Sequence, residues 1–362
     1  MTIVYARSGF SEPALTLFTL LAVIFIYKYE ATKQTKYIFL SGFLVGFSLL
    51  IKDVALIYIP LLLLYIIWKS LTLRLSIYSL IKLWLLSITP VLIFLILYHF
   101  NHTFMTPSEA HLSKGVAIKL LTSTKMLKGI YYYLFSAGKG YFFYNAPLLL
   151  GLFAIKNSIM RRKNIAIFCI IFIITNLFFY SCIFKRGSLF SWGPRYLYPT
   201  IPFMCVFLAQ FIESAASKFK KILIALFCFI GFIIQIPCLF INFSKYLFFV
   251  KEQLNLPEYF INFIPELSPI GGSWMLFLSA VNKTFTNISL NFRYNPDYLF
   301  SSGVIKGLQG YDVWDIWWVN VVKVAPQLLS TAIIIVSFMI IILVASFIGI
   351  RLFISKEIPK TK

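Results

Sequence analysis

The sequence predicts an all-α, polytopic membrane protein: a bundle of about nine transmembrane helices with a small extracytoplasmic segment before the last span. The 362-residue chain is 60% hydrophobic and only 12% charged, whereas a soluble domain carries about 25% charged residues. Its apolar runs approach the length of about 20 residues that crosses ~30 Å of hydrocarbon. Lysine and arginine gather in short clusters between these runs, so the net charge of +21 indicates membrane topology and not nucleic-acid binding.

Nine apolar runs are the candidate spans, with helix boundaries accurate to several residues. Only Lys52-Asp53 separates the second run from the third, which predicts a tight hairpin at one face of the membrane. The organisation we expect is a bundle over 1–243, an extracytoplasmic cap over 244–323, and a last helix with a basic tail over 324–362. The candidate spans are 14–28, 37–51, 53–68, 75–100, 131–155, 164–184, 200–216, 222–243 and 324–354.

The distribution of lysine and arginine orients the bundle, because cytoplasmic loops are enriched in these residues. The richer set of loops is placed in the cytoplasm, and the membrane we expect is the bacterial inner membrane. Nine spans then place residues 1–13 outside with no inserting helix before them, which predicts an N-terminally incomplete protein. The cytoplasmic set holds Lys28, Lys33, Lys36, Lys69, Arg74, Lys156, Arg161, Arg162, Lys163, Lys218, Lys220, Lys221, Lys356, Lys360 and Lys362.

Polar groups at membrane depth are costly, so each one is a candidate for function. Arg7 and Glu12 lie where the first span meets the outer surface. They are either functional or an interfacial pair that caps the helix before Pro13. Lys52 and Asp53 lie on the same outer face, either as a hairpin tip satisfied by water or with the lysine placed to meet a phosphate as a compact point charge.

Two further cations lie on the predicted outer face. Lys139 stands between two glycines in "SAGKGYFFYNAPLL" (136–149), and flanking glycines let the backbone approach a ligand closely. Snorkelling to lipid headgroups is the alternative. Arg195 in "SWGPRYLYPTIPF" (191–203) suits forked contact with a phosphate, or it anchors the chain at headgroup level. Together with Lys52, these groups favour binding of a lipid phosphate or pyrophosphate.

No metal site or cofactor is expected. The cluster "HFNHTFMTPSEAH" holds His99, His102, Glu109 and His111, but its spacing matches no strong ligand pattern, and an interfacial loop is the favoured reading. Five cysteines include no CxxC pair, so neither a disulfide framework nor a zinc site is indicated.

Several segments resemble the GT-C glycosyltransferases, and in particular the bacterial membrane enzymes grouped with protein O-mannosyltransferases and the aminoarabinose transferase of lipid A. The first are "YARSGFSEPALTLFTLLAVIFIYKY" and "FLSGFLVGFSLLIKDVALIYIPLLLL". "GKGYFFYNAPLLLGL" is similar to the family's Gly-basic-Gly-aromatic-Pro segment, and "SWGPRYLYPTIPF" to its Trp-Gly-Pro-Arg segment. "RYNPDYLFSSGVIKGL" and "DVWDIWW" resemble the stretch before the last span in several members.

The resemblance implies a helical bundle with a lateral groove that is open to lipid. It implies a polyprenyl-phosphate-linked sugar donor and a lipid, glycan or protein acceptor on the outer side of the membrane. By position, Glu12 matches an acidic residue of the family, and Lys52, Lys139 and Arg195 match its outward basic positions, with Arg7 in the same groove. The family's catalytic acid lies in a first outer loop that has no counterpart here, which leaves Glu12 and Asp53 as substitutes.

The function expected is therefore a membrane glycosyltransferase or its C-terminal portion. A catalytically incomplete remnant of the family is the first alternative. A translocase for lipid-linked saccharides, or a ligase that uses a lipid-linked donor, is the other. The spans offer only scattered polar residues and no inverted repeat, which disfavours transport.

Overall fold

The computed structural model describes residues 11–73, 77–105, 126–182, 191–241, 246–247, 250, 257–286, 327 and 329–357. These residues are all-helical, with 88% in helices and no strand among them. Two compact units divide the chain. The first comprises Met1–Pro237 and Phe243–Met275, and the second comprises Cys238–Asn242 and Leu276–Lys362. The expected divisions at residues 243 and 323 stay predictions.

Four helices in the described part of the chain are long and apolar enough to cross a membrane, as expected for a membrane protein. They begin at Glu12, Ile155, Arg195 and Lys218. Shorter apolar helices cover Lys36–Ile51, Val54–Lys69, Tyr78–Phe94, Pro269–Leu278 and Leu329–Ile342.

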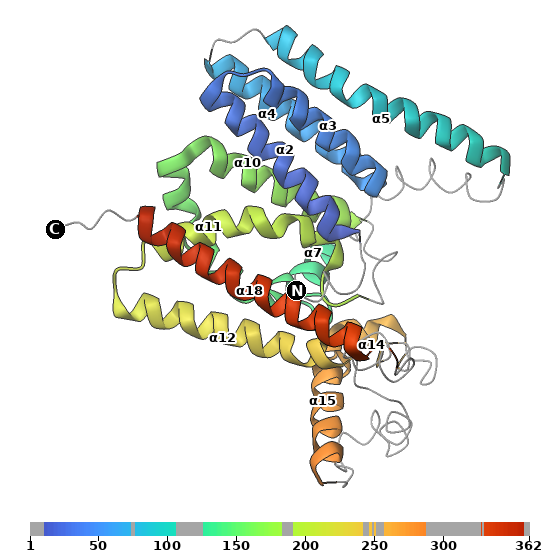
Figure 1. Ribbon diagram of the computed structural model, residues 1–362, viewed down its shortest axis with the longest axis vertical. Coiled ribbons are helices and arrows are strands. Elements are labelled where there is room, and N and C mark those ends of the chain that lie inside the picture. The colour runs from blue at the N-terminus through green and yellow to red at the C-terminus, as the bar shows by residue number, and fades with distance from the viewer. Residues whose placement is uncertain are drawn as a thin grey trace. The chain divides into compact units, whose positions relative to one another are not determined.

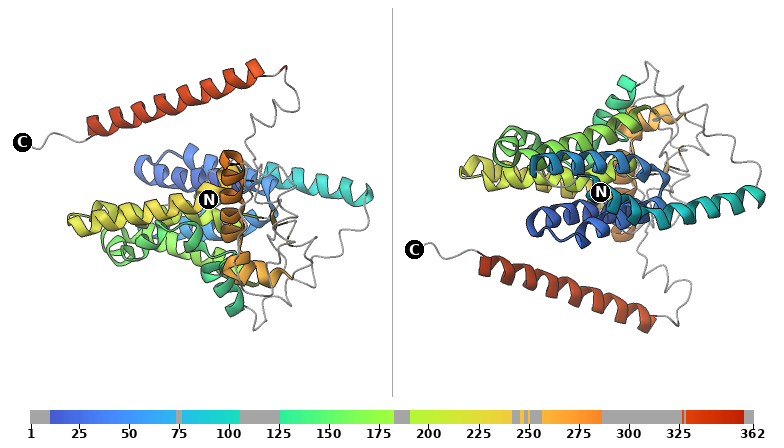
Figure 2. Two further views of the ribbon diagram at one scale, coloured as in Figure 1. Left: turned by 90° about the horizontal axis from the view of Figure 1, so that it is seen from below. Right: turned by 90° about the horizontal axis from the view of Figure 1, so that it is seen from above.

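The N-terminal helices of the first unit pack side by side (Figure 1). Helix α2 contacts α3, and α3 contacts α5 on its other side. Figure 2 shows the same helices from two further sides, with α2 and α3 in the darkest blue. Pro13 in its first turn suits the start of α2, and Lys33, with a φ of 59°, ends it in the left-handed conformation. The elements are α2 (Glu12–Thr32), α3 (Lys36–Ile51), the 3₁₀ helix η1 (Asp53–Ile57), α4 (Tyr58–Leu73) and α5 (Ile77–Met105).

Two glycines one turn apart let α3 approach α5 closely. A Cβ built on Gly42 would lie 2.0 Å from the Ser87 hydroxyl and 2.5 Å from the Trp84 carbonyl oxygen. A Cβ on Gly46 would lie 3.1 Å from a methyl group of Val91. Such G-x-x-x-G spacing is typical of helices that pack closely in membranes.

The segment predicted as one span over 131–155 is not a continuous helix. It forms three short helices, because Gly138 lies in one turn with Gly140 directly after it, and Pro147 ends a second turn at 145–147. The amide N–H of Gly138 donates to the carbonyl of Asn262 at 2.9 Å, and a Cβ on Gly138 would clash with the backbone there. The short helices are α7 (Met126–Phe135), α8 (Tyr141–Tyr144) and α9 (Leu148–Leu152).

Each of the other predicted spans overlaps a helix. The structure adds helices inside the predicted cap at 244–323, where no helix was predicted. In the first unit, α10 packs against α7 and α11, and η4 contacts both α2 and α10. The remaining elements are α10 (Ile155–Cys182), η4 (Arg195–Thr200), α11 (Ile201–Glu213), α12 (Lys218–Phe240), α14 (Glu258–Phe263), η6 (Pro265–Leu267), α15 (Pro269–Thr286) and α18 (Leu329–Glu357).

Replacing Gly42 by valine should force α3 away from α5, because the new side chain meets the backbone of Trp84. We expect about 1–3 kcal/mol of destabilisation, measured as a lower Tm of the purified protein in detergent. Gly46→Ala is the control, since its Cβ would have looser contacts, at 3.1 and 3.3 Å from side-chain atoms of Val91 and at 3.4 Å from the Cα of Ile88. Equal Tm values for the two variants would contradict the close packing described here.

Candidate functional site

One buried carboxylate gathers two cations from distant parts of the chain. Glu12, in the first turn of α2, has a side chain that is only 1% exposed. Its Oε1 accepts hydrogen bonds from Nζ of Lys52 and, at 2.6 Å, from Nε of Arg195. Lys52 lies between α3 and η1, and Arg195 begins η4. We call these three residues the Glu12 cluster.

The Glu12 cluster carries one negative and two positive charges and is partly open to its surroundings. The side chains of Lys52 and Arg195 are 23% and 24% exposed. Oε2 of Glu12 is buried and has no hydrogen-bond partner among the described residues. The cluster thus presents two partly exposed cations in front of a carboxylate that is shielded from solvent, an arrangement that can bind an anion.

Aromatic rings line the cluster. Nζ of Lys52 lies 4.7 Å from the centroid of the Tyr196 ring, and the Arg195 guanidinium carbon lies 5.9 Å from it. Tyr180 stacks on the other side of this ring at 4.9 Å between centroids. Burial lowers the pKa of Lys52, the Glu12 carboxylate opposes this effect, and the Arg195 charge adds to it. For the pKa of Lys52, the effect of desolvation therefore outweighs that of the neighbouring Glu12 carboxylate.

The turn that carries Arg195 is anchored by Lys139. Lys139 is fully buried, and its Nζ donates to the carbonyl oxygen of Ser191 at 2.7 Å and to the Ser191 hydroxyl at 2.9 Å. The ammonium therefore contacts protein in this structure. Lys139, in the turn between α7 and α8, therefore lies close to the turn that precedes Arg195 at the start of η4.

A second set of contacts holds the same turn. Gly193 has a φ of +69°, and a Cβ there would lie 2.6 Å from the Tyr144 ring, so only glycine fits without strain. The indole N–H of Trp192 donates to Oε1 of Gln235 at 2.9 Å, and the Gln235 amide donates to the carbonyl of Tyr144 at 2.9 Å. These contacts tie the residues before Arg195 to Tyr144 and Gln235.

The structure thus brings together Glu12, Lys52 and Arg195. Lys139 does not contact Glu12 in the bonds described above, but its hydrogen bonds to Ser191 hold the turn that precedes Arg195. Arg7 lies outside the described residues, as do Glu109 and His111, and the side chains of Asp53, His99 and His102 are likewise outside them. Among the residues that are described, no group of three or more His, Cys, Asp or Glu side chains is placed to hold a metal ion.

Ser191 and Gln235 were not singled out from the sequence, and neither was Tyr180. No local pattern identifies them, because each matters only through a partner more than 15 residues away, as in the Lys139–Ser191 and Trp192–Gln235 pairs. The signal that was available is the polarity of Gln235 within the apolar run 222–243.

The comparisons with known proteins identify no relative. No family model, curated protein or solved structure matches the chain. The site therefore has to be interpreted from its own geometry.

Glu12→Gln should lower the Tm in detergent, since two close cations would lose the carboxylate between them. Breaking a buried ion pair by removing one partner costs about 3 kcal/mol. In a double-mutant cycle, Glu12→Gln and Lys52→Met should couple by about 1–3 kcal/mol. Glu213→Gln is the control, because Glu213 is 67% exposed. Additive effects of Glu12→Gln and Lys52→Met on the free energy of unfolding would show that this pair contributes nothing.

Lys139→Met should destabilise the protein by about 2 kcal/mol, because Ser191 loses charge-assisted hydrogen bonds to its carbonyl and hydroxyl. Lys128→Met is the matched control on the exposed surface of α7. The measurement is Tm together with limited proteolysis of the turn at 191–195. An unchanged Tm and cleavage pattern for Lys139→Met would refute the anchoring role.

Proposed function

We propose that this chain is a membrane glycosyltransferase, or the C-terminal portion of one, that uses a polyprenyl-phosphate-linked sugar. The acceptor is a lipid, glycan or protein on the outer side of a bacterial inner membrane. The Glu12 cluster is the observation that carries the proposal, because it offers two partly exposed cations next to a shielded carboxylate. The proposed topology keeps about nine spans, with the Glu12 cluster at the outer face and the cap before the last span.

The cations suit the leaving group of such a transfer. The acceptor oxygen forms a bond to the anomeric carbon while the bond from that carbon to the phosphate oxygen breaks, and the electron pair leaves with polyprenyl phosphate. The guanidinium of Arg195 can donate hydrogen bonds to two phosphate oxygens, and the ammonium of Lys52 can donate to a third. Negative charge that develops on the departing phosphate is stabilised by both.

The first role of Glu12 in this proposal is to position the two cations. It holds Lys52 and Arg195 on one oxygen, so both cations reach the same region. Its second oxygen is buried and has no partner in the described part of the chain, so it is a candidate to accept the proton of the acceptor hydroxyl only for an acceptor that enters the bundle to reach it. Asp53 is the other carboxylate candidate for that proton, and the proposal assigns the base to one of these two or to a residue outside the described chain.

Two alternatives, a catalytically incomplete remnant and a translocase, differ from the transferase in the activities that they predict. A catalytically incomplete remnant would bind polyprenyl phosphate and transfer nothing. A translocase needs polar groups along a path through the bundle, but several of the buried polar side chains in the described helices are bonded to the protein itself. Thr16 and Thr19 bond to carbonyls in their own helix, and Asn176 bonds to Tyr58 and to the Phe172 carbonyl. These contacts favour a transferase or its remnant over a translocase.

Arg195→Ala should weaken binding of polyprenyl phosphate by the purified protein at least about tenfold, because a charge-assisted contact is lost. Arg195→Lys should give an intermediate value, since lysine lacks the fork. The Kd is measured by thermal shift in neutral detergent, and transfer is followed in membranes supplied with a panel of polyprenyl-phosphate-linked sugars.

Lys218→Ala is the control, because Lys218 is an exposed lysine at the start of α12. Equal Kd values for Arg195→Ala and Lys218→Ala would remove Arg195 from the site. Binding that depends on Arg195 without transfer of any sugar in the panel would support the remnant instead.

A further inference from the structure

A basic pocket lies at the other end of α2 and α4 from the Glu12 cluster. Its volume is about 510 Å³, within the range of about 300–1,000 Å³ that is typical of ligand sites. It forms where the C-terminal ends of α2 and α4 meet the first half of α10. We call it the basal pocket, and it is lined by Tyr27, Glu30, Lys69, Arg161, Arg162, Lys163, Asn164 and Ile165.

The basal pocket has a strong excess of positive charge. Among the described residues that line it, Glu30 is the one carboxylate, and it is neutralised by Lys69, whose Nζ lies 2.7 Å from Oε2. The carboxylate paired with Arg161 in the described part of the chain is Glu213, at 3.7 Å, and both side chains are more than half exposed, so this pair contributes little. Neither Arg162 nor Lys163 has a carboxylate within 4.0 Å among the described residues. Three cations are therefore available to an anion.

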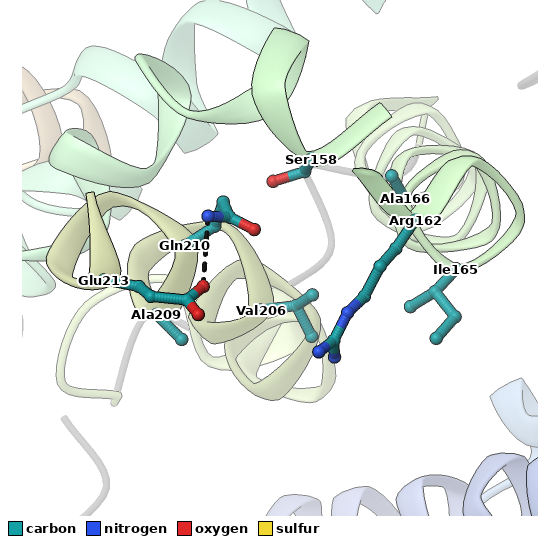
Figure 3. A pocket seen from close by; sticks show the side chains of 8 residues that line it. All are labelled: Ser158, Arg162, Ile165, Ala166, Val206, Ala209, Gln210 and Glu213. Atoms are coloured by element: carbon teal, nitrogen blue, oxygen red, sulfur yellow. Dashed lines mark hydrogen bonds between the residues drawn. The ribbon is translucent and has the colours of Figure 1, made fainter. Parts of the chain in front are cut away.

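A break in α10 separates these cations. Arg162 has non-helical backbone angles, with φ −138° and ψ 57°, inside the helix. It also lines a neighbouring cavity of about 460 Å³ between α10 and α11. Figure 3 shows its guanidinium reaching toward Val206, apart from the hydrogen-bonded pair of Gln210 and Glu213. At this kink, Arg162 lines both cavities, whereas Arg161 and Lys163 line the basal pocket.

The surroundings of the basal pocket suit a lipid better than a dissolved anion. Tyr27 is 50% exposed at the rim, and Ile24, one turn earlier on the same face of α2, is 38% exposed. A tyrosine at the end of an apolar helix is typical of the membrane interface. Basic pockets between helices at the cytoplasmic surface are suited to anionic headgroups.

We infer that the basal pocket binds the phosphate of an anionic glycerophospholipid, with Arg161, Arg162 and Lys163 around the headgroup and an acyl chain along the Ile24–Tyr27 face of α2. This site is separate from the Glu12 cluster and does not depend on the proposed function.

The test measures the Tm of the purified protein in neutral detergent against increasing short-chain phosphatidylglycerol, with short-chain phosphatidylcholine and inorganic phosphate as parallel titrations. Phosphatidylglycerol should raise the Tm, and the other two should not at the same concentrations. The double variant Arg161→Gln/Lys163→Gln should weaken the apparent affinity by roughly tenfold or more, while its Tm without lipid stays close to that of the parent.

Lys218→Gln/Lys221→Gln is the matched control, because it removes two exposed positive charges outside the pocket. Arg195→Ala should also leave the phosphatidylglycerol response unchanged, which distinguishes failure here from failure of the transferase proposal. Equal weakening by the two double variants would overturn the site. Stabilisation by inorganic phosphate or by phosphatidylcholine at the same concentrations would overturn its assignment to an anionic lipid.

Discussion

The sharing of one buried carboxylate oxygen between Lys52 and Arg195 is the interaction on which the candidate site depends. Glu12 is 40 residues from Lys52 and 183 residues from Arg195 along the chain. Its burial makes an unpartnered charge very unfavourable, so the carboxylate constrains both cations to the same place. The start of α2, the turn between α3 and α4, and η4 are consequently joined at a single atom. Lys139, Gly193 and their partners secure the turn before Arg195, which leaves the cluster little freedom to spread apart.

A second pair repeats this arrangement at the far end of the same helices. Glu30 near the end of α2 meets Lys69 near the end of α4, as Glu12 at the start of α2 meets Lys52 just before η1 and α4. The two glutamates are 18 positions apart on α2, so they are separated by roughly 27 Å along the axis. This is close to the ~30 Å thickness of a bilayer's hydrocarbon core. A membrane-spanning helix can keep charged pairs near water at its two ends. Arg195 shares the carboxylate of the first pair, and Arg161, Arg162 and Lys163 line the pocket beside the second.

The sequence predicted more about the elements than about their partners. Long apolar runs were enough to locate α2, α10, α11 and α12, and the ends of the runs predicted that Lys52 and Arg195 lie at helix ends. That these ends face the outer side of a membrane stays a prediction. The break at 131–155 was missed because hydropathy continues through Gly138-Lys139-Gly140 and Pro147, although those residues are turn formers. Glu12 was paired with Arg7 as one alternative, since a local partner was all that the sequence offered. Its partners in the structure come from tertiary packing, which spacing along a chain does not encode. Lys139 was judged by its flanking glycines, whereas burial against Ser191 depends on a turn 52 residues away.

The charge of the Glu12 cluster bears on how a transferase would use it. A sugar linked to polyprenyl phosphate through a phosphodiester carries one negative charge, whereas the departing polyprenyl phosphate carries up to about two at neutral pH, because the second pKa of such a monoester is near 6. The negative charge of Glu12 offsets one of the two positive charges, so the cluster has a net charge of one positive unit. It therefore attracts the singly charged donor less strongly than the two cations alone would. Its attraction rises as the bond to the sugar breaks and charge accumulates on the phosphate. Interactions that strengthen between the bound donor and the transition state are the ones that accelerate a reaction. The carboxylate does not itself sharpen this difference, because by Coulomb's law a cluster of charge +2 would distinguish the two charge states more strongly than one of +1. Its contribution is positional: by binding both Lys52 and Arg195 through one oxygen, Glu12 keeps the two cations together where the charge of the departing phosphate would develop.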